Sequence, residues 1–369
     1  MKRPRIETFD LLKGLGILLM IVGHSTGKMS GLRDFIFSFH MPLFFLISGY
    51  FFTSVKWKTL LSKNAQRLLV PYLFTGLLIG AYLVFEVWQA GGNPGFVALK
   101  RLKAIALGSG APRVLGMNAP IGAIWFLVAL FWSTIFLNIA LRTKYPLFLC
   151  LLFSGIGFAL HGEIFLPLSF QPGLTGALFL YVGYWVKQQG FLTADPLVPS
   201  VSALSASSNS SALPDLPTPA NVPFSNKGLL PLVAFALWFT SWQRGRLEMS
   251  CDYYRLWYFD MLGAISACYL LWLGMRAFEH WLQAHAESLS LTVRCANGIR
   301  RTLLFFGKYS LVVLCFHLVD LTCIPWKYVQ PIGWGEARLP LLWIEKIIFA
   351  YFMVQFTLRV PLLRKVFKI

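Results

Sequence analysis

The sequence predicts an all-α polytopic membrane protein with about ten transmembrane helices and with both termini in the cytoplasm. Of its 369 residues, 57% are hydrophobic and only 13% are charged, a composition too apolar for an ordinary soluble domain. Apolar runs long enough to cross a bilayer recur along the chain. Lysine and arginine are more frequent in the segments predicted to face the cytoplasm, as the positive-inside rule requires.

The N-terminal region contains two predicted helices joined by a short polar turn. A basic segment precedes the first helix, over about residues 9–25, and places its start in the cytoplasm. The second helix, over about residues 34–54, contains Pro42, which predicts a kink. A basic loop then leads to the third helix, over about residues 68–89.

The connection that follows, residues 90–120, is unusual because it is basic. It contains Lys100, Arg101, Lys103 and Arg113, although counting helices places it on the side of the membrane opposite the cytoplasm, where basic residues are depleted. We therefore expect it to form a surface-lying helix or a re-entrant segment over the functional site.

The remaining predicted helices are interrupted by one low-complexity segment. Residues 194–226 are rich in Ser, Pro, Ala and Asn and nearly lack aromatic residues, which predicts a flexible cytoplasmic linker. Residues 1–369 are thus expected to form a single membrane domain that this linker interrupts. The other helices are predicted at about residues 121–141, 146–160, 174–186, 229–242, 259–278, 302–324 and 339–360.

Ionisable side chains are concentrated in the first two predicted helices. Such groups are costly inside a membrane and indicate a functional site. Lys13 and His24 are eleven positions apart, a rise of about 16 Å, and lie on nearly the same helix face. Asp10 precedes Lys13 by three positions and can pair with it, and His40 adds a second imidazole. The alternative is that Lys13 extends to lipid phosphates and that His24 only packs.

These residues also carry a resemblance to a known family. The chain resembles the acyltransferase 3 family of integral-membrane acyltransferases, and in detail its fucose 4-O-acetylase-like branch. The family has an arginine, ten residues and a histidine in its first helix, and here Lys13 and His24 stand at these positions within FDLLKGLG and its continuation. FHMPLFFLISGYFF, residues 39–52, is similar to the second-helix signature. Weaker similarities are IWFLVALFW, residues 124–132, and GKYSLVVLCFHL, residues 307–318.

The resemblance implies an O-acyltransferase of a bacterial inner membrane. The implied donor is acetyl-CoA or another acyl-CoA, and the implied acceptor is a cell-surface glycan, a lipid-linked sugar or an exported polysaccharide. On this basis His24 is the candidate general base or its close partner. His40 would orient it, bind the acceptor or carry the acyl group. Lys13, positioned by Asp10, would face the phosphate or pantetheine part of the donor, although less directionally than an arginine would.

Further candidates lie elsewhere in the chain. Ser48 and Trp125 are expected to line the cavity. His317 is either a third polar group of the site or a packing histidine. Asp252 and Arg255 lie in an aromatic outer loop whose rings, carboxylates and guanidinium groups suit a sugar; an interfacial aromatic belt explains the same pattern.

Composition also restricts the other function classes. The net charge of +18 is spread over loops, and no soluble basic domain is present, so we expect membrane lipids rather than nucleic acid as partners. The six cysteines lack paired ligand spacing, which argues against a metal site, and we expect no permanently bound cofactor. No cleavable signal peptide is expected. A transporter of an anionic solute or polysaccharide precursor is the main alternative, and a non-catalytic scaffold would leave the intramembrane polar residues unexplained.

Overall fold

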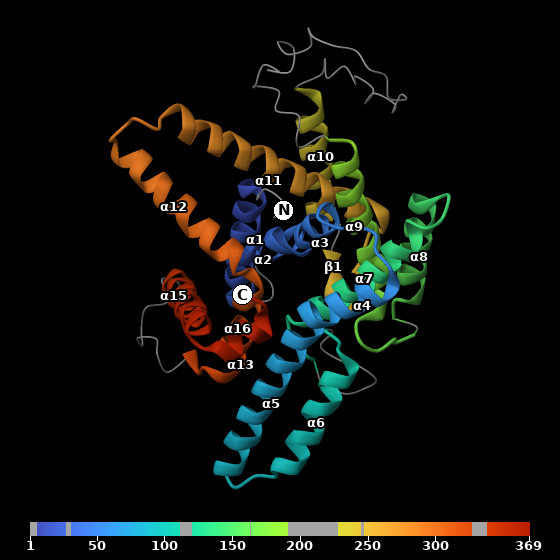
Figure 1. Cartoon of the computed structure of the whole chain (residues 1–369), viewed down its shortest axis with the longest axis vertical. Helices are drawn as coiled ribbons and strands as arrows, with labels where there is room; N and C mark the ends of the chain where they lie inside the picture. Colours follow the sequence, from blue (N-terminus) through green and yellow to red (C-terminus); the bar gives the residue numbers. More distant parts are fainter. Residues whose placement is uncertain are drawn as a thin grey trace, which may run out of the picture.

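The computed structural model is built almost entirely of helices, with one short β-hairpin among the described residues (Figure 1). It describes residues 6–26, 31–110, 120–162, 164–190, 228–244, 247–326 and 338–369. The first half of the chain contains α1 (Glu7–Ser25), α2 (Gly31–Phe37), α3 (His40–Tyr50), α4 (Trp57–Asn64), a π-helical turn (Ala65–Leu69), α5 (Val70–Gln89), α6 (Pro94–Leu107), α7 (Trp125–Ala140), α8 (Pro146–Leu160) and α9 (Phe170–Gln188). The second half contains α10 (Leu229–Arg244), β1 (Leu247–Glu248), a 3₁₀ turn (Met249–Cys251), β2 (Tyr253–Tyr254), α11 (Tyr258–Ala284), α12 (Leu291–Lys308), α13 (Ser310–Cys323), α15 (Arg338–Arg359) and α16 (Pro361–Phe367).

Several of these helices can cross a membrane. Within the described residues, 4 spans are long and apolar enough, and the number becomes 5 if the bent pair of α12 and α13 is counted as one span. The all-helical membrane architecture is therefore confirmed. The expectations of about ten spans and of cytoplasmic termini stay predictions. The candidate spans are Glu7–Ser25, Trp57–Gln89, Tyr258–Ala284, Leu339–Arg359 and the pair Leu291–Lys308 with Ser310–Cys323.

Two predicted helices are broken in the structure. The helix expected over residues 34–54 is divided into α2 and α3 at Phe39, whose backbone leaves the helical region at φ −142°. Pro42 then lies in the first turn of α3, where its missing N–H group leaves no helical hydrogen bond unmade, so it marks a helix start rather than a kink. The helix expected over residues 302–324 is likewise divided at Tyr309, and its two halves differ in direction by 82°.

The basic connection over residues 90–120 contains α6, which packs against α5 as a helical hairpin that extends away from the other helices (Figure 1). Asn93 caps the start of α6 by accepting a hydrogen bond from the Phe96 amide at 3.0 Å. Gly108 ends the helix in the left-handed conformation, φ +59°. The Tyr72 hydroxyl of α5 donates to the Ile105 carbonyl at 2.6 Å and joins the two helices.

Close backbone contacts at glycines set the packing of the central helices. A Cβ atom on Gly14 of α1 would collide with the Leu303 backbone of α12, and one on Gly307 of α12 would collide with the Asp10 backbone of α1. Gly49 of α3 meets the backbone of α9 in the same way. Small residues at such crossings let membrane helices approach at the backbone, where van der Waals contact replaces the hydrophobic driving force.

This packing predicts the effect of one methyl group. Gly307→Ala should destabilise the protein by about 1–3 kcal/mol, because α1 and α12 must separate to admit the new atom. Gly298→Ala, in the same helix, adds its methyl group to open space and is the matched control. Thermal unfolding of the purified variants in a neutral detergent measures the difference, and equal melting temperatures would refute the proposed contact.

Candidate active site

The start of α1 is tied to its neighbours by ion pairs and hydrogen bonds. Lys13 Nζ lies 2.6 Å from Asp10 Oδ1, as the spacing of three residues predicts, and the Asp10 side chain is almost fully buried. Glu7 pairs with Arg300 of α12, and Thr8 donates to Glu279 of α11 at 2.6 Å. The Lys13 ammonium uses one of its three donors on Asp10, so the other two can bind a ligand.

His24 lies near the other end of α1 and is exposed, although the residues around it are largely buried. Its ring centroid is 5.2 Å from that of Phe37 in α2 and 5.7 Å from that of His317 in α13. Two consecutive helices, α1 and α2, therefore meet the distant helix α13 at this imidazole. His24 is thus an accessible residue within an otherwise largely buried region.

His40 takes a different position from the one expected of a direct partner. It is buried at the start of α3, and its Nδ1 lies 3.1 Å from the Ile36 carbonyl oxygen. Its ring contacts Phe37 at 4.7 Å between centroids, and Phe37 also contacts His24. In the described structure the two histidines share this phenyl ring, and His40 also lies within electrostatic range of His24.

His317 belongs to a buried polar cluster that the sequence did not reveal. Its Nδ1 lies 2.7 Å from Asp320 Oδ2, and Asp320 Oδ1 lies 2.7 Å from Lys346 Nζ of α15. The Trp326 indole N–H donates to the same Oδ1 at 3.0 Å. All but Trp326 are less than 4% exposed. A buried ionised carboxylate is tolerated only when it is paired and hydrogen-bonded in this way.

This cluster defines the proton position on His317. An ionised carboxylate only accepts hydrogen bonds, so Nδ1 of the neutral ring is the protonated nitrogen. Nε2 then carries the free lone pair, and it is buried with no hydrogen-bond partner among the described residues. The His24 ring lies beside this imidazole, at 5.7 Å between the ring centroids.

Positive charge surrounds His24. Arg33 and Lys346 both lie within electrostatic range of its ring. The Arg33 guanidinium stacks over Phe37 at 4.1 Å from the ring centroid and lies 3.9 Å from Asp34. A negative charge that develops beside His24 is therefore stabilised by two nearby cations.

Ser48 and Trp125, the expected cavity residues, lie on α3 and at the start of α7. Ser48 is half-buried and precedes Gly49, where α3 crosses α9. Trp125 is 6% exposed and packs against Gly110. Both belong to the helical core, and the described contacts do not join either of them to His24.

Asp252 and Arg255 lie on the β1–β2 hairpin, and they point to different environments. Asp252 is 2% exposed, has a left-handed backbone, and accepts a hydrogen bond from Thr175 of α9 at 2.7 Å. Its other oxygen has no hydrogen-bond partner among the described residues and lies against Gly157 of α8. Arg255 is exposed. The carboxylate thus attaches the hairpin to the helices, whereas the guanidinium is available at the surface.

Among the described residues, no three His, Cys, Asp or Glu side chains are placed to hold a metal ion. The residues that sequence reasoning missed are Asp320 and Lys346. Their only sequence signal is that each is an ionisable residue within an apolar run, three positions after His317 in one case and near the start of the last long helix in the other.

Comparison with known proteins identifies the family. A family model described as an acyltransferase domain, that of the acyltransferase 3 family, matches residues 6–354, nearly the whole chain, and the chain belongs to this family. Membership supports acyltransferase activity and, with the apolar helices, an integral membrane protein. No curated protein and no solved structure matches the chain significantly.

The buried pair predicts a strong coupling between two helices. Lys346→Met leaves the Asp320 carboxylate uncompensated and should destabilise the protein by about 3–5 kcal/mol. The double variant Lys346→Met with Asp320→Asn removes both charges. Its free energy of unfolding should fall by much less than the sum of the decreases in the two single variants. Unfolding measured by loss of helical circular dichroism gives the coupling energy. Additive losses would show that the two charges do not interact.

Asp252 predicts a pH dependence. Burial raises the pKa of its carboxyl to about 7. A carboxyl whose pKa is higher in the folded chain contributes stability that is complete below about pH 4 and is lost as the pH rises through about 7. Asp252→Asn has the shape of the protonated acid, so the melting temperature of the wild type should fall relative to this variant between pH 5 and 8. Glu287→Gln changes an exposed carboxyl and should leave the wild-type pH profile unaltered.

Proposed function

We propose that this acyltransferase 3 protein transfers an acetyl group from acetyl-CoA, or another acyl group from acyl-CoA, to a hydroxyl of a cell-surface glycan, a lipid-linked sugar or an exported polysaccharide. The donor is a substrate and not a resident cofactor. The observation that carries the proposal is the accessible His24 ring beside His317, which is itself hydrogen-bonded to the buried Asp320.

His24 acts as the general base. It takes the proton of the acceptor hydroxyl as the oxygen attacks the thioester carbonyl carbon. In this proposal the lone pair on His317 Nε2 stabilises the resulting imidazolium, and Asp320 holds His317 in the required tautomer. This arrangement follows the logic of a base oriented by a hydrogen-bonded partner and a buried carboxylate.

The same surroundings favour the remaining steps. The tetrahedral intermediate carries a negative charge on the former carbonyl oxygen, and Arg33 and Lys346 provide positive potential there. Collapse of the intermediate breaks the carbon–sulfur bond and releases the CoA thiolate. His24 then returns its proton to the sulfur, so that the ester and the free thiol are the products and the imidazole is neutral again.

Lys13 and Asp10 serve the donor. Lys13 lies about 16 Å along α1 from His24, so a donor with its phosphate end at Lys13 would extend along this helix to place its thioester at the imidazole. The ammonium can bind a phosphate oxygen while it keeps its contact with Asp10, because it has three donors. His40, packed behind Phe37, is a positioning residue in this proposal.

The β1–β2 hairpin is proposed to take part in binding the acceptor sugar. Arg255 and the exposed Trp257 offer a guanidinium and an aromatic face to a sugar, while Asp252 holds the hairpin in place. Ser48 and Trp125 are proposed to contact the acceptor. The proposed setting is a bacterial inner membrane, with about ten transmembrane helices, both termini cytoplasmic and membrane lipids as the surroundings.

One observation favours the alternative of a transporter for an anionic solute or polysaccharide precursor. The α12–α13 pair is bent by 82° close to the buried polar cluster, and discontinuous helices line the binding sites of many transporters. Family membership favours the acyltransferase, and the experiment below separates the two functions.

Removal of the His24 imidazole should abolish transfer. Glycans from cells that produce the wild type should gain one acetyl mass per modified unit, and His24→Ala should lower this modification by about 10²–10⁴-fold because the general base is lost. His285→Ala, an exposed histidine after α11, is the control and should retain full modification. Mass spectrometry of the glycans and assay of free thiol released from acetyl-CoA provide the two readouts.

Full acetylation by His24→Ala would remove this residue from the mechanism. Unmodified glycan in all strains, with its export changed by the wild type, would favour the transporter.

A further inference from the structure

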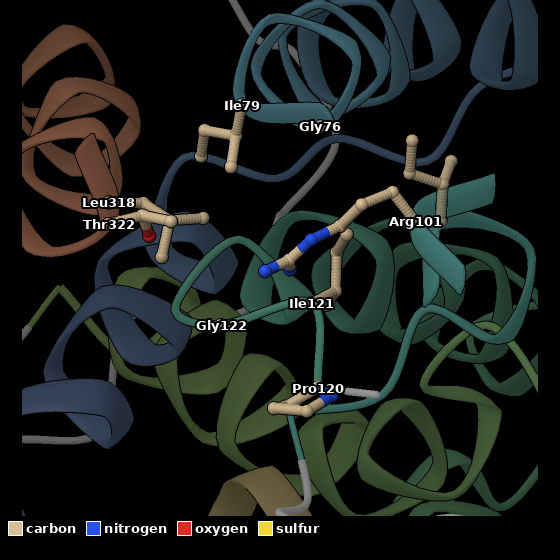
Figure 2. Close-up of a pocket in the computed structure, with 9 residues that line it drawn as sticks. Gly76, Ile79, Arg101, Pro120, Ile121, Gly122, Leu318 and Thr322 are labelled. Atoms are coloured by element: carbon tan, nitrogen blue, oxygen red, sulfur yellow. The ribbon is translucent and has the colours of Figure 1, made fainter. Parts of the chain in front are cut away.

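A cavity of about 200 Å³ lies outside the His24 site, between the α5–α6 hairpin, the turn at residues 120–122 and α13. Figure 2 shows it with Ile79 and Gly76 of α5 on one side, Leu318 and Thr322 of α13 on another, and the turn beneath. Most of the side chains that line it are apolar, and those of Arg101 and Thr322 are polar. Leu318 directly follows His317, so this cavity and the candidate active site lie on different faces of the same helix.

Arg101 of α6 points its guanidinium group into this cavity (Figure 2). Gly80 of α5 lies opposite the first carbon of the Arg101 side chain and leaves it room to turn inward. Within the described part of the chain, no carboxylate forms an ion pair with Arg101 and no acceptor forms a hydrogen bond with it. The surroundings lower the pKa of the guanidinium by desolvation, yet arginine remains protonated in proteins. The cavity therefore contains a cation without a counter-charge among these residues.

The walls of the cavity are held in place by specific contacts. The Ile121 amide donates to the Ser109 carbonyl at 2.8 Å and anchors the turn to the end of α6. Gly122 has φ +78°, and a Cβ atom there would collide with Leu318. The space is thus a feature of the packed fold, formed before any ligand arrives, which lowers the entropic cost of binding.

We propose that this cavity binds a single oxyanionic group, a phosphate monoester or a carboxylate, carried on an apolar chain. A guanidinium binds such oxyanions through two parallel hydrogen bonds. Among the described lining side chains Arg101 provides the charge and Thr322 a single hydroxyl, and the volume is below the roughly 300–1,000 Å³ of sites for whole drug-sized ligands such as a complete sugar nucleotide. The cavity therefore admits the charged head and a few carbons.

The surroundings indicate where the apolar chain would lie. Leu99 and Leu102 lie on either side of Lys100 and Arg101 in the sequence of α6. Both leucines are more than half exposed, as is Phe85 of α5. These side chains give the α5–α6 hairpin an apolar outer surface, and the hairpin also carries the half-buried Arg101, a combination that suits an amphiphile more than a water-soluble anion. The proposal also gives a role to Arg101, one of the basic residues that the positive-inside rule disfavours at the expected location of this helix. It concerns binding alone and is independent of the acyl-transfer mechanism.

Dodecyl phosphate is the probe for the test. The full-length protein, purified in the neutral detergent dodecyl maltoside, is titrated with dodecyl phosphate, and native mass spectrometry counts the bound molecules. We expect one saturable molecule on the wild type. Arg101→Met should weaken its binding about tenfold or more, because a hydrogen-bonded charge pair is lost. Lys103→Met, which removes an exposed charge from the same helix, should stay within about twofold of the wild type.

Further arms distinguish the anion and the chain. Dodecanoate tests whether a carboxylate replaces the phosphate, and saturable binding of either one supports the proposal. Arg101→Lys keeps the positive charge but not the planar guanidinium group, so its affinity for the probe should lie between those of the wild type and Arg101→Met. It also serves as the test variant if Arg101→Met does not fold. Equal affinity of the wild type and the Arg101 variants, an equal loss in Lys103→Met, or inorganic phosphate that binds as tightly as dodecyl phosphate would overturn the proposal.

Discussion

The arrangement of the candidate active site depends on one buried carboxylate. Asp320 can be ionised in the apolar interior only because Lys346, His317 and the Trp326 indole all direct hydrogens at it. This requirement joins α13 to α15 and fixes the orientation of the His317 ring. Because His317 faces His24, the carboxylate determines the environment of the accessible imidazole although it does not touch it.

The bend between α12 and α13 allows α1 to be held differently at its two ends. The Lys13 end packs against α12 through Gly14 and Gly307, where the backbones meet without intervening side chains. The His24 end faces α13, whose direction differs by 82°. One continuous helix therefore has a closely packed half with an ion pair at its start and a more open half with a titratable ring. These are different environments for the two ends of a long donor molecule.

The sequence predicted the helical membrane class and the Asp10–Lys13 pair, because both depend on composition and on neighbours within one helix. It could not predict the break at Phe39, since a proline in an apolar run is equally typical of a kink and of a helix start. The Asp320–Lys346 pair was missed because its partners are 26 residues apart, and no periodic pattern links them. The burial of Asp252 likewise depends on Thr175 of a distant helix.

Ionisable groups in this fold belong to two classes, and the difference has a functional meaning. Asp320 with Lys346 is compensated within the protein and joins α13 to α15, and Asp10 occupies one of the three donors of Lys13 within α1. Arg101 has no such compensation in the described structure, and it faces a cavity that another molecule can enter. A charge left without a partner in apolar surroundings costs free energy, and a ligand that completes the pair recovers it. Arg101 is therefore the position where binding of an anion gains most, whereas His24, as a base, is neutral before it takes a proton.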